Sequence, residues 1–190
     1  PDGSFQNCAR PFPTLWRLWV AALFLRPLGR FCRWFISDTY SGWDGTTPRV
    51  IDWQSGCCVL FDGPLLKRLG GFDPQFFFNF DEVDLCRRVW QSGRKILYNP
   101  EPTITHIGGH SLAKFPVRIE IEKYRNRYRY FHKWWGPRGA RRVKTVSVFW
   151  LVTRTWGNWL KWKLRGSDLG RERYEMYRVA ARWNRRLDPV

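Results

Sequence analysis

The apolar residues in the first part of the chain alternate between strand-like runs and helical spacings. Residues 50–61 predict a strand, because their second half is continuously apolar, as in a strand buried on both faces. Helices are expected over residues 62–70 and 81–92, where apolar positions recur on one face. Two further short strands are expected over residues 94–100 and 103–107. This order of elements predicts the α/β class.

Local signals add detail to this first part. Gly56, inside the expected strand, predicts a bulge or the close approach of another group to the backbone. Residues 1–13 are rich in turn formers and predict an extended surface loop. Thr14 can cap a helix over residues 14–26, which is too short to span a bilayer. Its pattern fits both a core helix and a helix in the membrane interface.

From residue 117 the apolar spacing is helical to the end of the chain. Three helices are expected, over residues 118–135, 140–164 and 170–187, with the first break at Gly136 and Pro137. The apolar middle of the second helix is too short for a transmembrane span. Its end is rich in Trp and Lys, which fits a helix lying among lipid headgroups.

The positive charge is concentrated in this helical part. The formal net charge is +17, and residues 114–190 hold 21 Lys and Arg against 6 Asp and Glu. Residues 1–113 are nearly neutral, with 12 basic and 10 acidic residues. We therefore expect two regions, a mixed domain over 1–113 and a basic, Trp-rich tail over 114–190. Such a tail suggests an anionic surface, either phospholipid or nucleic acid.

The cysteines do not suggest a disulfide framework or a zinc site. There are five, an odd number, and no C-x-x-C pair occurs among them. Three lie inside apolar runs, so we interpret them as reduced core thiols of a cytosolic protein.

A cluster of carboxylates is the clearest candidate for chemistry. Asp81, Glu82 and Asp84 follow a run of aromatic residues and open the helix expected over 81–92. Carboxylates held against an apolar wall tend to have a raised pKa, which suits a general base. The alternative is helix capping, with Asp81 as the cap and Asp84 at the third helical position.

An ordered series of motifs resembles the family 2 inverting glycosyltransferases, and within them a bacterial rhamnosyltransferase-like group. The resemblance covers roughly residues 1–136 and is specific because several motifs occur in order. The matching segments are residues 1–6, 51–61, 70–73, 77–88, 93–100, 106–111 and 124–136. The resemblance implies a GT-A fold, a Rossmann-like α/β domain that uses a nucleotide-sugar and a divalent metal, Mn²⁺ or Mg²⁺.

The resemblance also implies roles for individual residues. Glu82 matches the catalytic base that deprotonates the acceptor hydroxyl, with Asp81 beside it. The family usually has Glu followed by Asp here, whereas this chain has Asp followed by Glu. The longer side chain shifts the carboxylate by about one methylene, and misplacement on that scale matters for catalysis.

Four further positions carry expected contacts. His106 matches the position that contacts the metal or the diphosphate, and imidazole suits Mn²⁺. Asp52 and Trp53 match a segment that lines the acceptor side, where Trp stacks well on sugars, although Trp53 as plain core is equally compatible with the pattern. Asp84 is counted with the substrate-binding residues, while keeping its place as a capping candidate.

The donor-binding part of such a domain has no counterpart here. The D-x-D metal motif of the family is absent from the 190 residues. We therefore expect the C-terminal, acceptor half of a GT-A domain followed by an all-helical basic tail, inactive by itself. The parent enzyme would transfer a deoxyhexose such as rhamnose to a lipid-linked or polysaccharide acceptor, at the cytoplasmic face of the cell membrane. The alternative is a binding module without catalysis, because residues 124–135 mix cations and aromatics as single-strand nucleic-acid surfaces do.

Overall fold

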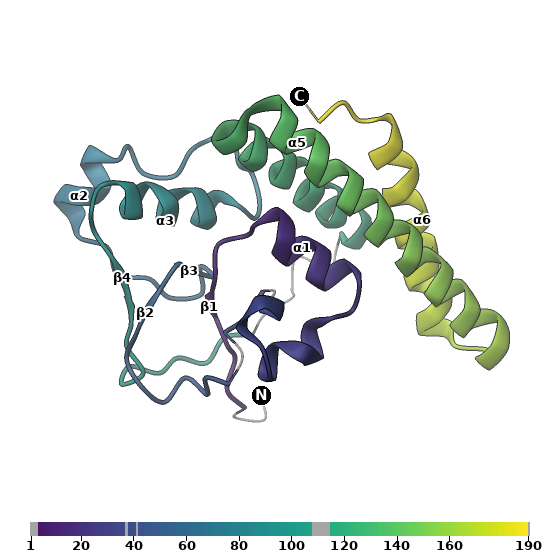
Figure 1. Ribbon diagram of the computed structural model, residues 1–190, viewed down its shortest axis with the longest axis horizontal. Coiled ribbons are helices and arrows are strands. Elements are labelled where there is room, and N and C mark those ends of the chain that lie inside the picture. The colour runs from purple at the N-terminus through teal and green to yellow at the C-terminus, as the bar shows by residue number, and fades with distance from the viewer. Residues whose placement is uncertain (1–3, 37, 41, 108–114, 190) are drawn as a thin grey trace. The chain divides into compact units, whose positions relative to one another are not determined.

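The chain forms two compact units in the computed structural model, residues Pro1–Gly108 and Gly109–Val190 (Figure 1). The structure describes residues 4–36, 38–40, 42–107 and 115–189. The domain boundary expected between residues 113 and 114 falls outside the described residues. The first unit is mixed α/β and the second is helical, which confirms the coarse fold class.

The strands of the first unit form two small antiparallel sheets. Strand β1 (Ala9–Arg10) pairs with β3 (Trp53–Gln54), and Ala9 lies opposite Gln54. Strand β2 (Arg49–Ile51) pairs with β4 (Ile96–Tyr98). No larger sheet occurs among the described residues. The Rossmann-like half therefore stays a prediction.

Two of the expected strands are wrong in whole or in part. The strand expected over 50–61 breaks at Asp52 and ends at Gln54, and residues 55–62 form a turn and loop in which Leu60 is 99% exposed. Residues 103–107 form no strand either, and Ile107 is exposed. An apolar run becomes a strand only where a neighbour accepts and donates its backbone hydrogen bonds along the run. Beyond the bond from the N–H of Ser55 to the carbonyl of Cys8, neither segment pairs with a strand among the described residues.

The first helix of this unit begins where its capping signal predicts. Helix α1 (Leu15–Ala22) is capped by Thr14, whose hydroxyl accepts from the backbone N–H of Arg17. It ends four residues earlier than expected and is followed by two short 3₁₀ turns, Arg26–Arg30 and Arg33–Phe35. Its Val20 and Ala22 are buried, as a core helix requires.

Helices α2 (Gly63–Arg68) and α3 (Asp81–Gln91) are joined by one arginine. Asp62 caps α2 by accepting from the N–H of Leu65. Arg88 of α3 donates to the carbonyl oxygens of Leu69 and Gly71, at 2.6 and 2.7 Å, where α2 ends. Its Nε also donates to the carboxylate of Asp84, at 2.9 Å. The start of α3 is therefore held in place from inside the unit.

The second unit is a bundle of three helical segments. Helix α5 (Pro116–Arg165) changes direction at Gly136, whose φ of 66° is left-handed, directly before Pro137. Helix α6 (Asp168–Arg186) then packs back along it (Figure 1). The break predicted at Gly136 is confirmed as a kink. No helix that the structure describes is long and apolar enough to cross a membrane.

A buried hydrogen bond fastens the two helices of this unit. The hydroxyl of Tyr128 lies 2.7 Å from the side-chain nitrogen of Asn184, and both side chains are fully buried. Close to the turn between the helices, a β-carbon on Gly170 would lie 3.1 Å from the backbone nitrogen of Trp162. A side chain there would press on the backbone of α5, so glycine favours the close approach of α5 and α6.

Candidate active site

The acidic helix begins from a strained turn. Asn79 and Phe80 both adopt left-handed backbone conformations, with φ of 61° and 70°. Phe80 is the residue that precedes the helix, and no side chain caps it. The predicted capping roles of Asp81 and Asp84 are therefore wrong, because Asp81 is already the first helical residue. A bulky residue in this conformation costs about 1–3 kcal/mol, and such strain concentrates at functional sites.

Glu82 lies against the backbone of Gly56. The N–H of Gly56 donates to its carboxylate at 3.3 Å, and a β-carbon at residue 56 would lie 3.1 Å from the same oxygen, Oε1. The close approach predicted at Gly56 is thus confirmed, and the group that approaches is the candidate base itself. The turn that follows β3 therefore helps to position the side chain of Glu82 at the start of α3.

The surroundings of Glu82 favour its protonated form. Burial raises the pKa of Glu82 to about 7, and the neighbouring Asp81 adds to this through a hydrogen bond and its negative charge. The N–H of Gly56 works in the opposite direction, since it donates to the ionised form. A carboxylate with a pKa near neutrality can both accept and release a proton at physiological pH.

Asp81 completes a pair of carboxylates. Its Oδ1 is buried and has no hydrogen-bond partner within the described part of the chain. A buried polar atom without a partner is rare in folded proteins and often marks a place where a ligand binds. Asp81 therefore offers an acceptor beside the carboxylate of Glu82.

The raised pKa predicts an unusual pH dependence of stability. Folded Glu82 keeps its proton up to about pH 7, whereas Glu82 in the unfolded chain loses its proton near its ordinary pKa of 4.5. Its contribution is complete below pH 4.5 and is lost as the pH rises through 7. Glu82→Gln removes this loss, so we expect it to raise the unfolding free energy by about 3 kcal/mol at pH 8, with almost no effect at pH 4.

Urea denaturation of the chain at these two pH values measures the effect. Glu101→Gln, at an exposed side chain, is the control for the loss of one carboxylate. A Glu82→Gln variant that is equally stabilised at both pH values would contradict the assigned pKa.

Asp52 and Trp53 connect the site to the N-terminal segment. The carboxylate of Asp52 accepts from the backbone N–H of Phe12 at 2.7 Å, and the indole N–H of Trp53 donates to the carbonyl of Pro11 at 2.9 Å. The indole N–H of Trp90, on α3, donates to the carbonyl of Asp52 at 3.1 Å. These bonds give both residues a structural role, and their contact with an acceptor stays a prediction.

Asp84 lies beneath the site and has no access to solvent. Its side chain is 0% exposed and holds Arg88, which in turn bonds to the end of α2. The substrate contact expected for Asp84 stays a prediction that this burial does not support. Arg88 was not among the predicted site residues, although its i,i+4 spacing from Asp84 is the signal for such a pair.

His106 lies at the surface of the first unit beside Gln6. Its Nδ1 is 2.9 Å from the side-chain oxygen of Gln6, so one residue from each of two matching segments meets the other there. With the amide oxygen as acceptor, Nδ1 carries the proton and Nε2 presents a lone pair. Across the described residues, no group of three or more His, Cys, Asp or Glu could hold a metal ion.

Comparison with known proteins gives consistent similarities. The chain is 28% identical, over 189 residues, to the N-acetylglucosaminyl-diphospho-decaprenol L-rhamnosyltransferase of Mycobacterium tuberculosis in two strains. The match covers 98% of this chain and 54% of the relative, so the chain spans about half the length of these relatives. Over 66 residues, 35% of this chain and 25% of the relative, it is 30% identical to the rhamnosyltransferase WbbL of Escherichia coli K12.

No family model and no solved structure matches the chain. The similarity to the mycobacterial enzyme nevertheless extends through both units. The chain is thus similar over nearly its whole length to bacterial rhamnosyltransferases.

Proposed function

We propose that these residues form the acceptor half of an inverting glycosyltransferase that moves a deoxyhexose from a nucleotide-sugar to a lipid-linked acceptor. The observation that carries this is the paired Asp81 and Glu82 at the start of α3, with the pKa of Glu82 raised to about 7. The relatives named as rhamnosyltransferases, one of them for a decaprenol-linked substrate, support the sugar and the acceptor class.

In the proposed reaction Glu82 acts as the general base. Its carboxylate removes the proton of an acceptor hydroxyl as that oxygen attacks the anomeric carbon of the donor. The bond from that carbon to the diphosphate breaks on the opposite side, and the nucleoside diphosphate leaves with the bonding electrons. Attack from the opposite face inverts the configuration. A base with a pKa close to the working pH is the most effective for such a transfer.

The remaining parts of the site are assigned more simply. Asp81 keeps the proton affinity of Glu82 high, and its free Oδ1 is an acceptor for a sugar hydroxyl. His106, through Nε2, faces the diphosphate. A divalent metal, Mn²⁺ or Mg²⁺, belongs to the proposal for the parent enzyme, in which His106 would contact the metal or the diphosphate. Every step above uses only protein side chains.

An assay of the longer parent enzyme tests the function. It is incubated with nucleoside-diphosphate rhamnose donors of known anomeric configuration and with polyprenyl-diphosphate N-acetylglucosamine. We expect transfer to the lipid-linked sugar, with the opposite anomeric configuration in the product by NMR, and no turnover by the 190 residues alone. Retention of configuration, or no transfer from any donor, would contradict the proposal.

A further inference from the structure

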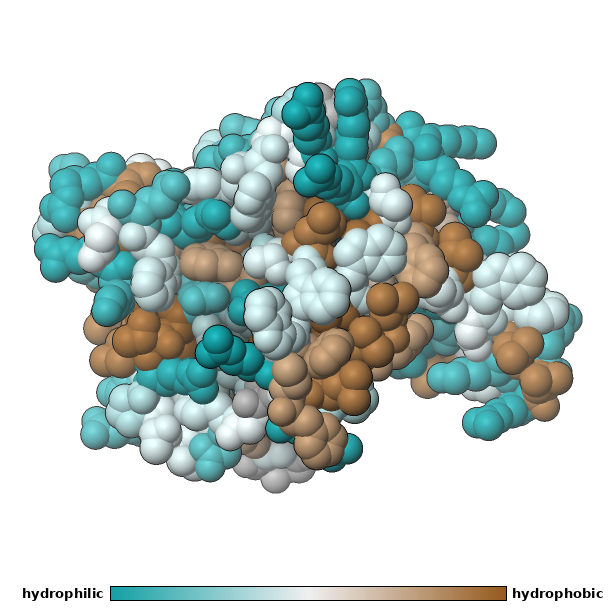
Figure 2. Space-filling view, viewed as in Figure 1, coloured by the Kyte–Doolittle hydropathy of each residue, from teal (hydrophilic) through white to brown (hydrophobic). Residues whose placement is uncertain are grey.

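The turn between α5 and α6 exposes a row of apolar side chains. Trp156, Leu160 and Leu164 follow one another at intervals of four residues, and are 63%, 49% and 75% exposed. Residues at this spacing lie on one side of a helix. Leu169, in the first turn of α6, is 55% exposed and extends the row across the turn. In Figure 2 apolar and charged side chains lie next to each other at this end of the two helices.

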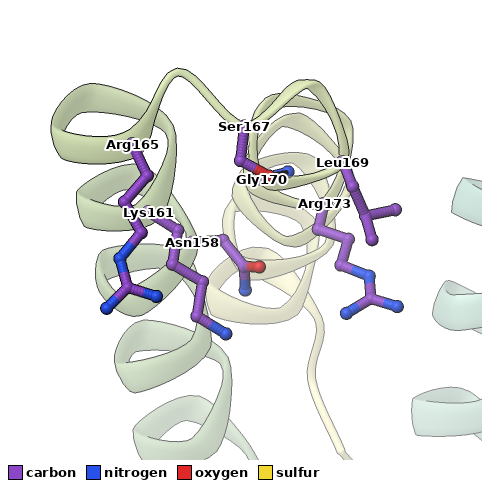
Figure 3. A pocket seen from close by; sticks show the side chains of 7 residues that line it. All are labelled: Asn158, Lys161, Arg165, Ser167, Leu169, Gly170 and Arg173. Carbon is purple, nitrogen blue, oxygen red and sulfur yellow. Dashed lines mark hydrogen bonds between the residues drawn. The ribbon is translucent and has the colours of Figure 1, made fainter.

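Basic side chains border this row. Figure 3 shows Lys161 and Arg165 projecting from α5 and Arg173 from α6, around a cavity of about 210 Å³. None of the three forms an ion pair with any residue that the structure describes. Asn158, only 7% exposed, lies between them. The cavity is smaller than the 300–1,000 Å³ of ordinary small-molecule sites, so it suits a single anionic group.

The turn itself is firmly built. Gly166 ends α5 in a left-handed conformation, and the hydroxyl of Ser167 accepts from the N–H of Gly170 at the start of α6. The rings of Trp162 and Tyr174 lie 5.8 Å apart across the two helices. The apolar row and the basic cavity are therefore held in a fixed relation to each other.

We propose that this end of the helical pair docks on a bilayer of anionic phospholipid, with the apolar row in the interface and a lipid phosphate in the basic cavity. Interfacial helices typically carry Trp and Leu next to Lys and Arg. The apolar side chains enter the boundary between the headgroups and the acyl chains, while the cationic groups reach the headgroups. Residues 156–173 carry five basic and two acidic side chains, so their charge complements such a surface.

A second copy of this chain fits the surface less well, because the two basic borders would repel each other. The inference rests on the proposed function only for the expectation that the acceptor is lipid-linked. Docking itself needs no catalysis and can be measured without it.

The test is co-sedimentation of the 190-residue chain with phosphatidylcholine vesicles that contain or lack phosphatidylglycerol. Leu160→Ser with Leu164→Ser should weaken binding to the anionic vesicles more than tenfold. Lys161→Gln, Arg165→Gln and Arg173→Gln together should weaken it on the order of a hundredfold, because each basic residue contributes about fivefold. The matched control is Arg138→Gln, Arg141→Gln and Arg142→Gln, which removes the same charge from exposed positions elsewhere on α5.

Several outcomes would overturn the proposal. One is that the three control substitutions weaken vesicle binding as much as the three substitutions around the cavity, which would show that any positive charge on the chain attracts the vesicles. Another is binding to neutral vesicles that is just as tight. A third is self-association that Leu160→Ser with Leu164→Ser abolishes while vesicle binding is unchanged. The last is tight binding to single-stranded polyuridylate with no binding to vesicles. The proposal is supported if vesicle binding is lost in the leucine variant and in the cavity variant but not in the control variant. This result does not depend on the outcome of the transfer assay.

Discussion

Replacing Glu82 by glutamine in the parent enzyme should lower the rate of sugar transfer by about 10²–10⁴-fold, the range that a positioned general base contributes. Glutamine keeps the shape of the side chain and can still accept from the N–H of Gly56, but it cannot take a proton. Donor binding should therefore stay unchanged, and the loss should appear in kcat. Measurement of kcat together with the dissociation constant of the nucleotide-sugar separates the two effects.

The pH dependence of the wild-type rate is a second test of Glu82 as the general base. A base must be ionised to act, so kcat/KM should rise with pH and level off above the pKa of Glu82, which is raised to about 7. Asp81→Asn removes a charge and a hydrogen bond that raise this pKa, so it should move the rise to lower pH. An unchanged rate in Glu82→Gln, or an unmoved profile in Asp81→Asn, would contradict the assignment.

Replacing Asp84 by alanine should destabilise the first unit by about 3–5 kcal/mol, because it removes one partner of a buried ion pair. The carboxylate of Asp84 is fully buried, and Arg88 would keep its charge with only the carbonyls of Leu69 and Gly71 as partners. A domain is stable by only about 5–15 kcal/mol, so this is a large fraction of the total. Urea denaturation of the chain measures the loss.

An exposed ion pair within one helical turn, spaced i,i+3 rather than i,i+4, provides the control. Glu175 and Arg178 pair on α6 with about half and a third of their side chains exposed, 46% and 37%. Glu175→Ala should therefore cost about 1 kcal/mol or less. Similar losses in the two variants would show that Arg88 does not depend on Asp84.

The sequence predicted best what depends on neighbouring residues. Thr14 caps the helix that follows it, and the break at Gly136 is present, because each signal acts within one helical turn. The strand over 55–61 failed because its state depends on a pairing partner far along the chain. The capping role of Asp81 failed because Phe80 takes a left-handed conformation that no propensity predicts.

The candidate site shows the same division. The sequence indicated the acidic pair and a close approach at Gly56, but not that the two belong together, since 26 residues separate Gly56 from Glu82. The contact of His106 with Gln6, 100 residues apart, carries no local signal at all. The sequence could indicate the residues of such pairs only through the resemblance of their segments to a known family. That resemblance identifies functional positions, but it does not say which of them are in contact.

The contact between Gly56 and Glu82 makes the position of the candidate base depend on a residue 26 positions away in the chain. A β-carbon at residue 56 would lie 3.1 Å from Oε1 of Glu82, so the carboxylate would have to move by a few tenths of an ångström to make room for it. Since Oε1 lies at the flexible end of its side chain, such a shift changes where the base lies without excluding glutamate from position 82. The turn at residue 56 therefore determines the aim of the carboxylate as well as its proton affinity.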